Sequence, residues 1–370
     1  MRLNTLELWG FRNYVQCECS FSPDVNIIYG ANAQGKTNLL EAIYLLSCGR
    51  SFRTRSDSEL IQFGGDSAAV KALADAQGRE QTVEIYLKRG ARKTILKNGA
   101  RVRGNELSEA VSTVFFCAED LNLVRGGAAV RRRLLDYAIS QLRPGYAVAL
   151  AEFNRLYEHK TRILRDWREK PSLLDTLQEF SGQMCRASAV LIRYRAAFSA
   201  KLTALASAIH REFTNGKEEL GIVYKTVSTV TDPLAELAEI TAEILEHQRS
   251  HFQAELNSGQ CLTGAHKDDL YITINGVAAR EFASQGQART VALSLKLAER
   301  EMHLLESGEN PVLLLDDVLS ELDGERQDFV LNRIGGGQTF ITCCEDRRIA
   351  ERTGGAVFVV ENGTVKREAD

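Results

Sequence analysis

The segment that most constrains this fold is GANAQGKT, at residues 30–37. It matches G-x-x-x-x-G-K-[ST], with an apolar run before it and helical apolar spacing after it. In a strand–loop–helix of this kind, glycines let successive N–H groups point at a phosphate beside the helix N-terminus. A glycine-rich turn that only by chance precedes Lys and Thr is the alternative, and it leaves the flanking strand and helix unexplained. We therefore expect a nucleotide-binding loop made of Gly30, Ala31, Asn32, Ala33, Gln34, Gly35, Lys36 and Thr37.

A nucleotide bound with Mg²⁺ needs further polar groups, and an acidic segment near the other end of the chain offers them. Lys36 is expected to reach the β- and γ-phosphates, and Thr37 to ligate Mg²⁺. The run VLLLDD, residues 312–317, reads as a buried strand that ends in two carboxylates. Asp316 is the candidate metal ligand, acting through the water shell. Asp317 is the candidate catalytic residue, placed where a base or a water-positioning residue is needed for attack on the γ-phosphate. Taken alone, an apolar strand ending in acid also fits a plain sheet edge.

The segments near the two ends of the chain have strand character. Residues 1–29 alternate and then become fully apolar, and residues 67–103 return to strands with a hairpin turn at KNGA, residues 97–100. Between them, the helix after the glycine loop should carry an apolar stripe and end at Gly49. The last seventy residues contain three short buried strands, PVLLLDD, QTFITC and AVFVV.

The middle of the chain has helical spacing instead. Residues 146–167 and 173–213 favour two helices, and the second would be about 60 Å long. Pro171 breaks the pattern between them, and Ser172 is expected to cap the second helix. A further helix is expected from about 234 to 256, followed by a hairpin at 270–279.

This order predicts an α/β fold with one discontinuous domain and an inserted helical lobe that bears a short helical hairpin. The expected domain comprises residues 1–118 and 295–370, and the lobe comprises residues 119–294.

Composition places the chain among ordinary soluble proteins. Its formal net charge is −3, yet residues 125–170 hold 11 Lys and Arg against 5 Asp and Glu. A negatively charged partner would therefore have to bind a local basic surface rather than the protein as a whole. No stretch approaches the roughly 18 apolar residues of a membrane span, and the N-terminal segment lacks the apolar core of a signal peptide. We expect a cytoplasmic protein without a membrane partner.

About 280 residues separate the glycine loop from the acidic strand, which is too wide for a small-molecule kinase built on one compact sheet. Seven segments, spread over essentially the full length, resemble the RecF family of bacterial recombination and gap-repair proteins. That family belongs to the ABC-type ATPases, which also include the SMC proteins. The segments are LELWGFRNY, YGANAQGKTNLLEAI, GRSFRT, EDLNLVRGGAAVRRRLLD, GAHKDDL, FASQGQ and LLLDDVLSELD.

The resemblance implies a P-loop ABC-type ATPase head that binds ATP and Mg²⁺. In such ATPases a Ser-x-Gly-Gln signature at a helix N-terminus binds the γ-phosphate of a nucleotide held by the other subunit. Ser284, Gly286 and Gln287 match it, and Ser320 to Asp323 resemble a loop that crosses the same dimer interface. An ordinary helix cap is an equal alternative for SQGQ taken alone.

Two features depart from the pattern of ABC transporters. Asp317 stands where they usually carry Glu, which suggests slow hydrolysis, and TFITCCED offers no switch histidine. Spacing identifies no Mg²⁺-sensing glutamine.

The resemblance further implies a homodimer bridged by ATP, which binds duplex, gapped or junction DNA and helps to load RecA with RecO and RecR. A weak, DNA-dependent ATPase activity would act as the switch in gap repair and replication restart.

Two arginine clusters are candidates for DNA contact because guanidinium groups suit phosphate oxygens. Arg125, Arg131, Arg132 and Arg133 form the first, and Arg50, Arg53 and Arg55 form the second. Solvated faces, salt-bridge networks and contacts to ATP remain alternatives. A lone histidine, His266 in GAHKDD, is not assigned a catalytic role.

Two rival functions stay open at this stage. The first is the nucleotide-binding subunit of a transporter, which co-purification with membranes would reveal. The second is an SMC-like scaffold whose ATP turnover is incidental.

Overall fold

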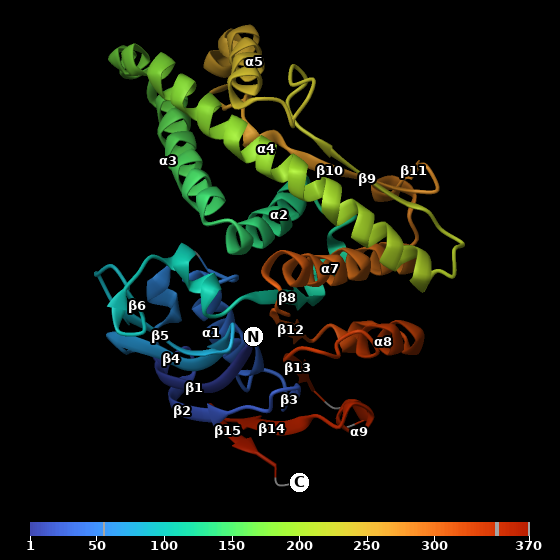
Figure 1. Ribbon diagram of the computed structural model, residues 1–370. Helices are drawn as coiled ribbons and strands as arrows, with labels where there is room; N and C mark the ends of the chain where they lie inside the picture. Colours follow the sequence, from blue (N-terminus) through green and yellow to red (C-terminus); the bar gives the residue numbers. More distant parts are fainter. Residues whose placement is uncertain (55, 345–347, 369–370) are drawn as a thin grey trace. The chain divides into compact units, whose positions relative to one another are not determined.

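The computed structural model describes residues 1–54, 56–344 and 348–368. The chain divides into two compact units (Figure 1). The first unit comprises Met1–Leu121 and Lys296–Asp370, and the second comprises Asn122–Leu295. Among the described residues, no helix combines the length and the apolar character that crossing a bilayer requires.

The first unit contains an antiparallel sheet with the order β2-β1-β4-β5-β6-β7. Its strands are β1 (Arg2–Phe11), β2 (Tyr14–Ser20), β4 (Ser67–Ala76), β5 (Arg79–Lys88), β6 (Thr94–Lys97) and β7 (Ala100–Arg101). Asn98 and Gly99 join β6 to β7 with φ angles of 52° and 76°. Positive φ at both central residues is what a tight two-residue hairpin turn requires, so the predicted turn is confirmed.

A second sheet in the same unit has the order β15-β14-β3-β13-β12-β8. Its strands are β3 (Val25–Tyr29), β8 (Thr113–Cys117), β12 (Val312–Asp316), β13 (Thr339–Cys343), β14 (Ala356–Glu361) and β15 (Thr364–Arg367). All neighbouring pairs are parallel except β14 with β15. The three C-terminal strands expected from the sequence are confirmed. The carboxyl ends of β3, β13, β12 and β8 therefore meet at one edge of the sheet, where ligands of α/β folds commonly bind.

Helix α1 (Lys36–Cys48) packs against strands of both sheets. The sequence predicts an apolar stripe on one side of this helix, but ten residues of α1 are buried, including Glu41. Glu41 Oε1 accepts a hydrogen bond from Arg12 Nη2 (2.8 Å) and from Ser51 Oγ (2.5 Å). A helix enclosed by two sheets is buried on every side, which the amphipathic pattern does not predict. Its end at Gly49, with φ 68°, is confirmed.

The second unit is mainly helical. Its long helices are α2 (Ala128–Leu142), α3 (Pro144–Asp166), α4 (Leu174–Phe213) and α5 (Leu237–Ser258). A three-stranded antiparallel sheet joins β9 (Leu220–Lys225), β10 (Asp269–Ile274) and β11 (Val277–Ala278). The predicted helical hairpin, α3 packed on α4, is confirmed (Figure 1).

The predicted cap at Ser172 is wrong. Pro171–Leu173 form a 3-10 turn that runs directly into α4, so Leu173 is the N-cap and no side chain caps the helix. Ser172 thus lies inside the 3-10 turn, one residue before the N-cap position of α4.

The remaining helices are α6 (Ala279–Phe282), α7 (Gln285–Ser307), α8 (Gly324–Leu331) and α9 (Arg348–Thr353). Helix α7 begins in the second unit and ends in the first.

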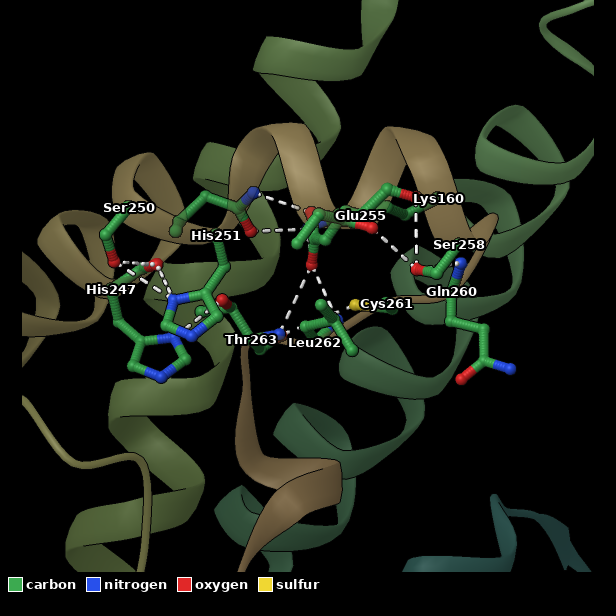
Figure 2. Close-up of polar contacts among 12 residues, drawn as sticks. Lys160, His247, Ser250, His251, Glu255, Ser258, Gln260, Cys261, Leu262 and Thr263 are labelled. Atoms are coloured by element: carbon green, nitrogen blue, oxygen red, sulfur yellow. Dashed lines mark hydrogen bonds and ion pairs between the residues drawn. The ribbon is translucent and has the colours of Figure 1, made fainter.

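A fully buried ion pair ties α3 to α5 inside the second unit (Figure 2). Lys160 Nζ lies 2.8 Å from Glu255 Oε2 and also donates to the amide oxygen of Gln248. Glu255 Oε1 accepts the backbone N–H groups of Leu262 and Thr263 at 2.7 and 3.2 Å. Paired charge of this kind is costly to break, so it fixes how the two helices meet.

Candidate nucleotide-binding site

The glycine loop between β3 and α1 adopts a conformation that only small residues allow. Gly30 has φ 156° and Gly35 has φ 116°. A Cβ atom on Gly30 would lie 2.4 Å from Val360 O, and one on Gly35 would lie 2.5 Å from Asn13 Nδ2. Asn13 Nδ2 in turn donates to Gln34 O at 2.8 Å. Both glycines are therefore required by close approach of backbone and side chains.

Two backbone carbonyl groups of the loop hold the Lys36 ammonium. Lys36 Nζ donates to Gly30 O at 2.6 Å and to Ala31 O at 2.9 Å, and the residue is only 7% exposed. Asn32 accepts a hydrogen bond from Cys344 Sγ, while Ala31, Asn32 and Ala33 are exposed at the rim of the loop. The loop thus combines one buried cation with backbone amides at a helix N-terminus, an arrangement suited to phosphate.

Thr37 and Asp316 meet at the carboxyl edge of the parallel sheet. Thr37 Oγ1 donates to Asp316 Oδ1 at 3.0 Å, and Thr342 Oγ1 donates to the same oxygen at 2.9 Å. Burial raises the pKa of the Asp316 carboxyl, and the nearby charges of Asp317 and Glu119 act in the same direction. A bound cation would offset the free-energy cost of keeping this buried carboxyl ionised. The hydroxyl and carboxylate oxygens are hard donors of the kind that Mg²⁺ prefers, so these residues fit a magnesium ion.

Asp317 follows β12 in a left-handed conformation, with φ 54°. Its backbone N–H donates to Thr342 Oγ1 at 2.8 Å, and its carboxylate accepts a hydrogen bond from Ser320 Oγ at 2.9 Å. Non-glycine residues held at positive φ are uncommon and occur often at functional sites. The exposed Asp317 carboxylate therefore lies next to the metal-ligand candidate in the chain and is hydrogen-bonded to Ser320.

Two features near this edge were missed by sequence reasoning. The first is Glu119, which follows β8 where Cys117 pairs with Asp316 in parallel register. The apolar strand TVFFC followed by AED was the available signal. The second is the partner of Arg53, a residue named from the sequence as a candidate for DNA or ATP contact: its Nη1 donates to Asn38 Oδ1 at 2.8 Å. Arg53 thus stands beside the first turn of the loop helix, whereas Arg55 lies outside the described residues.

The segment Ser284–Gln287, which matches the Ser-x-Gly-Gln signature and is called the signature loop below, forms a capping box in the second unit. Gln287 N donates to Ser284 Oγ at 3.2 Å, and Ser284 N donates to Gln287 Oε1 at 2.9 Å. Helix α7 begins at the next residue, Gln285, and Ser284 is exposed while Gly286 is half-buried. The helix-cap interpretation is confirmed as local geometry, and it presents an exposed serine at a positive helix end.

The first arginine cluster separates into buried and exposed members. Arg131 is 3% exposed and pairs with both carboxylate oxygens of Asp269, at 2.7 and 2.9 Å. This corrects its place among the DNA contacts, because its donors are already used inside the second unit. Arg132, half-buried, donates to Asp268 O at 2.7 Å. Arg125 and Arg133 are exposed and stay candidates for DNA contact.

The GAHKDD segment also has an internal role. Asp268 is fully buried and accepts hydrogen bonds from Arg195 Nη1 and Tyr224 Oη, both at 2.6 Å. Burial lowers the pKa of His266 to about 4, so it is neutral near pH 7. These residues form a polar core of the second unit.

Comparison with known proteins identifies the family of the chain. Residues 2–365 match the family described as the RecF/RecN/SMC N terminal domain. The chain is 40% identical to the DNA replication and repair protein RecF of Listeria innocua, over 99% of this chain and 100% of the relative.

Two solved structures of the recombination mediator protein RecF in the RecFOR pathway are similar to it. The one described as RecF-ATPrS has a TM-score of 0.91 at 34% identity, and covers 99% of this chain and 98% of its own. The one described as RecF-ATP has a TM-score of 0.89 at 35% identity, and covers 100% and 98%. The family match and the full-length similarity in sequence and fold give one result: the chain belongs to the RecF family, within the wider group of RecF, RecN and SMC proteins.

Proposed function

We propose that this protein is an ATP-dependent DNA-binding switch of recombinational gap repair and replication restart. In the proposed cycle, two copies close around ATP, bind duplex, gapped or junction DNA, and separate after slow hydrolysis. The single observation that carries the proposal is the meeting of Lys36, Thr37 and Asp316 at one sheet edge. The RecF-ATP structure, which shares the fold and 35% of the sequence, supports ATP as the ligand.

Each residue of the site has a task in binding. The amides of the loop from Gly30 to Thr37 and the Lys36 ammonium hold the β- and γ-phosphates. Thr37 and Asp316 hold Mg²⁺, which when bound neutralises charge on the phosphate oxygens. The triphosphate is thereby fixed in one orientation before reaction.

We assign the hydrolytic step to Asp317. The oxygen of water forms a bond to the γ-phosphorus while the bond to the β–γ bridging oxygen breaks, and the water's proton passes toward Asp317. Because an aspartate side chain is shorter than a glutamate, its carboxylate reaches less far toward the water, and we expect slow turnover. Slow turnover suits a switch, since the closed state must last long enough to be used.

The signature loop supplies the second half of each site in trans. The Ser284 hydroxyl, the Gly286 amide and the positive end of α7 would meet the γ-phosphate held by the other copy. Gln287 completes the loop through its capping box with Ser284. Because the γ-phosphate contacts exist only before hydrolysis, its loss shifts the pair toward separation.

DNA binding and partners extend this proposal. Arg125 and Arg133 are exposed and would meet DNA phosphates without reading bases. The relatives are described as proteins of DNA replication and repair and of the RecFOR pathway, which supports RecO and RecR as partners in loading RecA.

Sedimentation with ATP, ADP or no nucleotide, with and without duplex DNA, tests the proposal. We expect the mass to double only with ATP, and DNA to bind this form with a log–log salt slope of about −0.9 per phosphate contacted. A mass that never doubles, or DNA binding insensitive to salt, would contradict it.

The SMC-like scaffold remains a second candidate because the fold is shared with the SMC group. Lys36→Arg and Asp317→Asn distinguish the two. Repair that survives both substitutions in cells would favour the scaffold.

A further inference from the structure

We propose that Glu218 is a positioning residue for the signature loop, which holds the amide of Gln287 in the one orientation that presents Ser284 to a second copy. Glu218 lies between α4 and β9 and has no place in the signature pattern itself. This inference rests on the proposed function, since it concerns how the trans half of the site is kept in shape.

The Gln287 amide is bonded at both ends. Its Nε2 donates to Glu218 Oε1 at 2.9 Å, and its Oε1 accepts the backbone N–H of Ser284 at 2.9 Å. An ionised carboxylate only accepts hydrogen bonds, and a backbone N–H only donates. Rotating the amide by half a turn would set donor against donor and acceptor against acceptor. Glu218 and Ser284 together therefore permit a single orientation of this side chain.

That orientation determines what Ser284 can offer. With its own N–H bonded to Gln287 Oε1, Ser284 accepts the Gln287 backbone N–H at its hydroxyl oxygen, at 3.2 Å. A hydroxyl that accepts in this way keeps its hydrogen for donation elsewhere. Ser284 is exposed, so that hydrogen is available to an incoming phosphate oxygen.

Glu218 is itself held in place from α4. Its Oε2 lies 3.0 Å from His210 Nε2, and His210 is fully buried. Because the carboxylate only accepts, this nitrogen carries the hydrogen. The other ring nitrogen, Nδ1, lies 3.4 Å from Ser294 Oγ. Gln287 and Ser294 are seven residues apart and so lie on the same face of α7. The first and third turns of α7 are thus tied to α4 through one carboxylate and one imidazole.

If the Glu218 contacts only stabilised the second unit, their loss would lower its stability without a specific effect on dimerisation. A positioning role predicts that dimerisation and ATP affinity respond differently to their loss. The loop from Gly30 to Thr37 lies in the first unit, so ATP affinity of the single copy should not depend on Glu218. Closure of the pair should depend on it.

The experiment uses the full-length protein and Glu218→Ala, with Glu219→Ala as the matched control. Glu219 is the adjacent carboxylate and is exposed. ATP affinity is measured at concentrations where the protein is a single copy, and the dissociation constant of the ATP-dependent dimer is measured by sedimentation. We expect Glu218→Ala to weaken dimerisation about tenfold, because a hydrogen bond to a charged group is lost, while ATP affinity is unchanged. The control should change neither quantity.

Two further variants separate positioning from a general loss of structure. Glu218→Gln keeps an oxygen that can accept from Gln287 Nε2, so it should restore part of the dimerisation. In a Gln287→Ala background, Glu218→Ala should have no further effect, because the group it positions is gone. This double-mutant comparison remains valid even where Glu218→Ala lowers the unfolding temperature.

The outcomes are distinct. If the natural protein dimerises with ATP and Glu218→Ala dimerises equally well, or if its effect is the same with and without Gln287, the inference is overturned while the proposed function stands. If the natural protein fails to dimerise with ATP, the proposed function falls and the inference falls with it.

Discussion

Thr37 Oγ1 donates to Asp316 Oδ1 at 3.0 Å although 279 positions separate the two residues. The contact exists because β3 and β12 lie on either side of β13 in a parallel sheet, which brings the residues that follow them to one edge. It joins the phosphate loop to the acidic strand and defines the metal-binding half of the proposed site.

Asp316→Asn should separate stability from function. Asn keeps an oxygen that can accept from Thr37 and Thr342 but removes a buried negative charge, so the nucleotide-free protein should be more stable by about 1 kcal/mol. The additional stabilisation by ATP with Mg²⁺ should be lost, because the metal loses a ligand. Thermal unfolding with and without Mg²⁺ and ATP measures both effects. An undiminished shift with Mg²⁺ and ATP would contradict the assignment of Asp316.

Lys160→Met should strongly destabilise the second unit. It leaves Glu255 buried without its cation, which costs about 3–5 kcal/mol. Urea unfolding provides the measurement. The matched control is Lys170→Met, at an exposed position, which should change stability by less than about 0.5 kcal/mol. Equal unfolding curves for the two variants would refute the structural role of the pair.

The same pair predicts a pH dependence. Burial alone would raise the pKa of Glu255, but Lys160 and hydrogen bonds, including one from Gln248, hold it below its ordinary value of 4.5. A lowered pKa means that the carboxylate contributes stability above pH 4.5 and loses it as the pH falls through the lowered value. The deficit of Lys160→Met should therefore be largest near neutral pH and narrow on acidification, as its buried Glu255 takes up a proton. A deficit that is constant from pH 7 to 4 would argue against this explanation.

Arg131 and Arg133 should behave in opposite ways despite being two positions apart. Arg131→Ala leaves the partly exposed Asp269 without its cation and removes the donor to the Leu123 and Gly126 carbonyls, so it should lower the stability of the second unit by about 1–3 kcal/mol. Arg133→Ala should leave stability nearly unchanged, weaken DNA binding, and reduce the magnitude of the log–log salt slope by about 0.9. Fluorescence anisotropy at several salt concentrations tests the second claim. Unchanged slopes for Arg125→Ala and Arg133→Ala would remove this cluster from the DNA surface.

Local sequence signals predicted much of the fold. The pairs Asn98-Gly99 and Asn275-Gly276 form hairpin turns in which both residues have positive φ. Asn and Gly are the residues that adopt positive φ most readily, so the dipeptide alone indicates such a turn. The buried strand before Asp316 was equally visible, because a strand buried on both faces is apolar throughout. The phosphate loop was the clearest signal of all, since its glycines are required by close approach.

Long-range contacts were not predictable in the same way. Arg131 belongs to a cluster that looks like a phosphate-binding surface, and only its contact with Asp269, 138 positions away, shows that it is internal. Lys160 contacts Gln248 and Glu255, which lie 88 and 95 positions away in the chain. Pairings of this kind depend on how helices pack, which a one-dimensional pattern does not contain.

The most direct test of the central claim, that each ATP is shared between two copies, mixes two inactive variants. Lys36→Ala removes the loop cation and Ser284→Ala removes the signature hydroxyl, so neither variant alone can form a complete site. A mixed pair contains one intact loop facing one intact signature. We expect ATP-dependent dimers in the mixture and not in either variant alone, as measured by sedimentation of differently tagged proteins. If the natural protein dimerises with ATP but the mixture does no better than its separate components, the two residues do not act on one nucleotide across the pair, and the account is wrong.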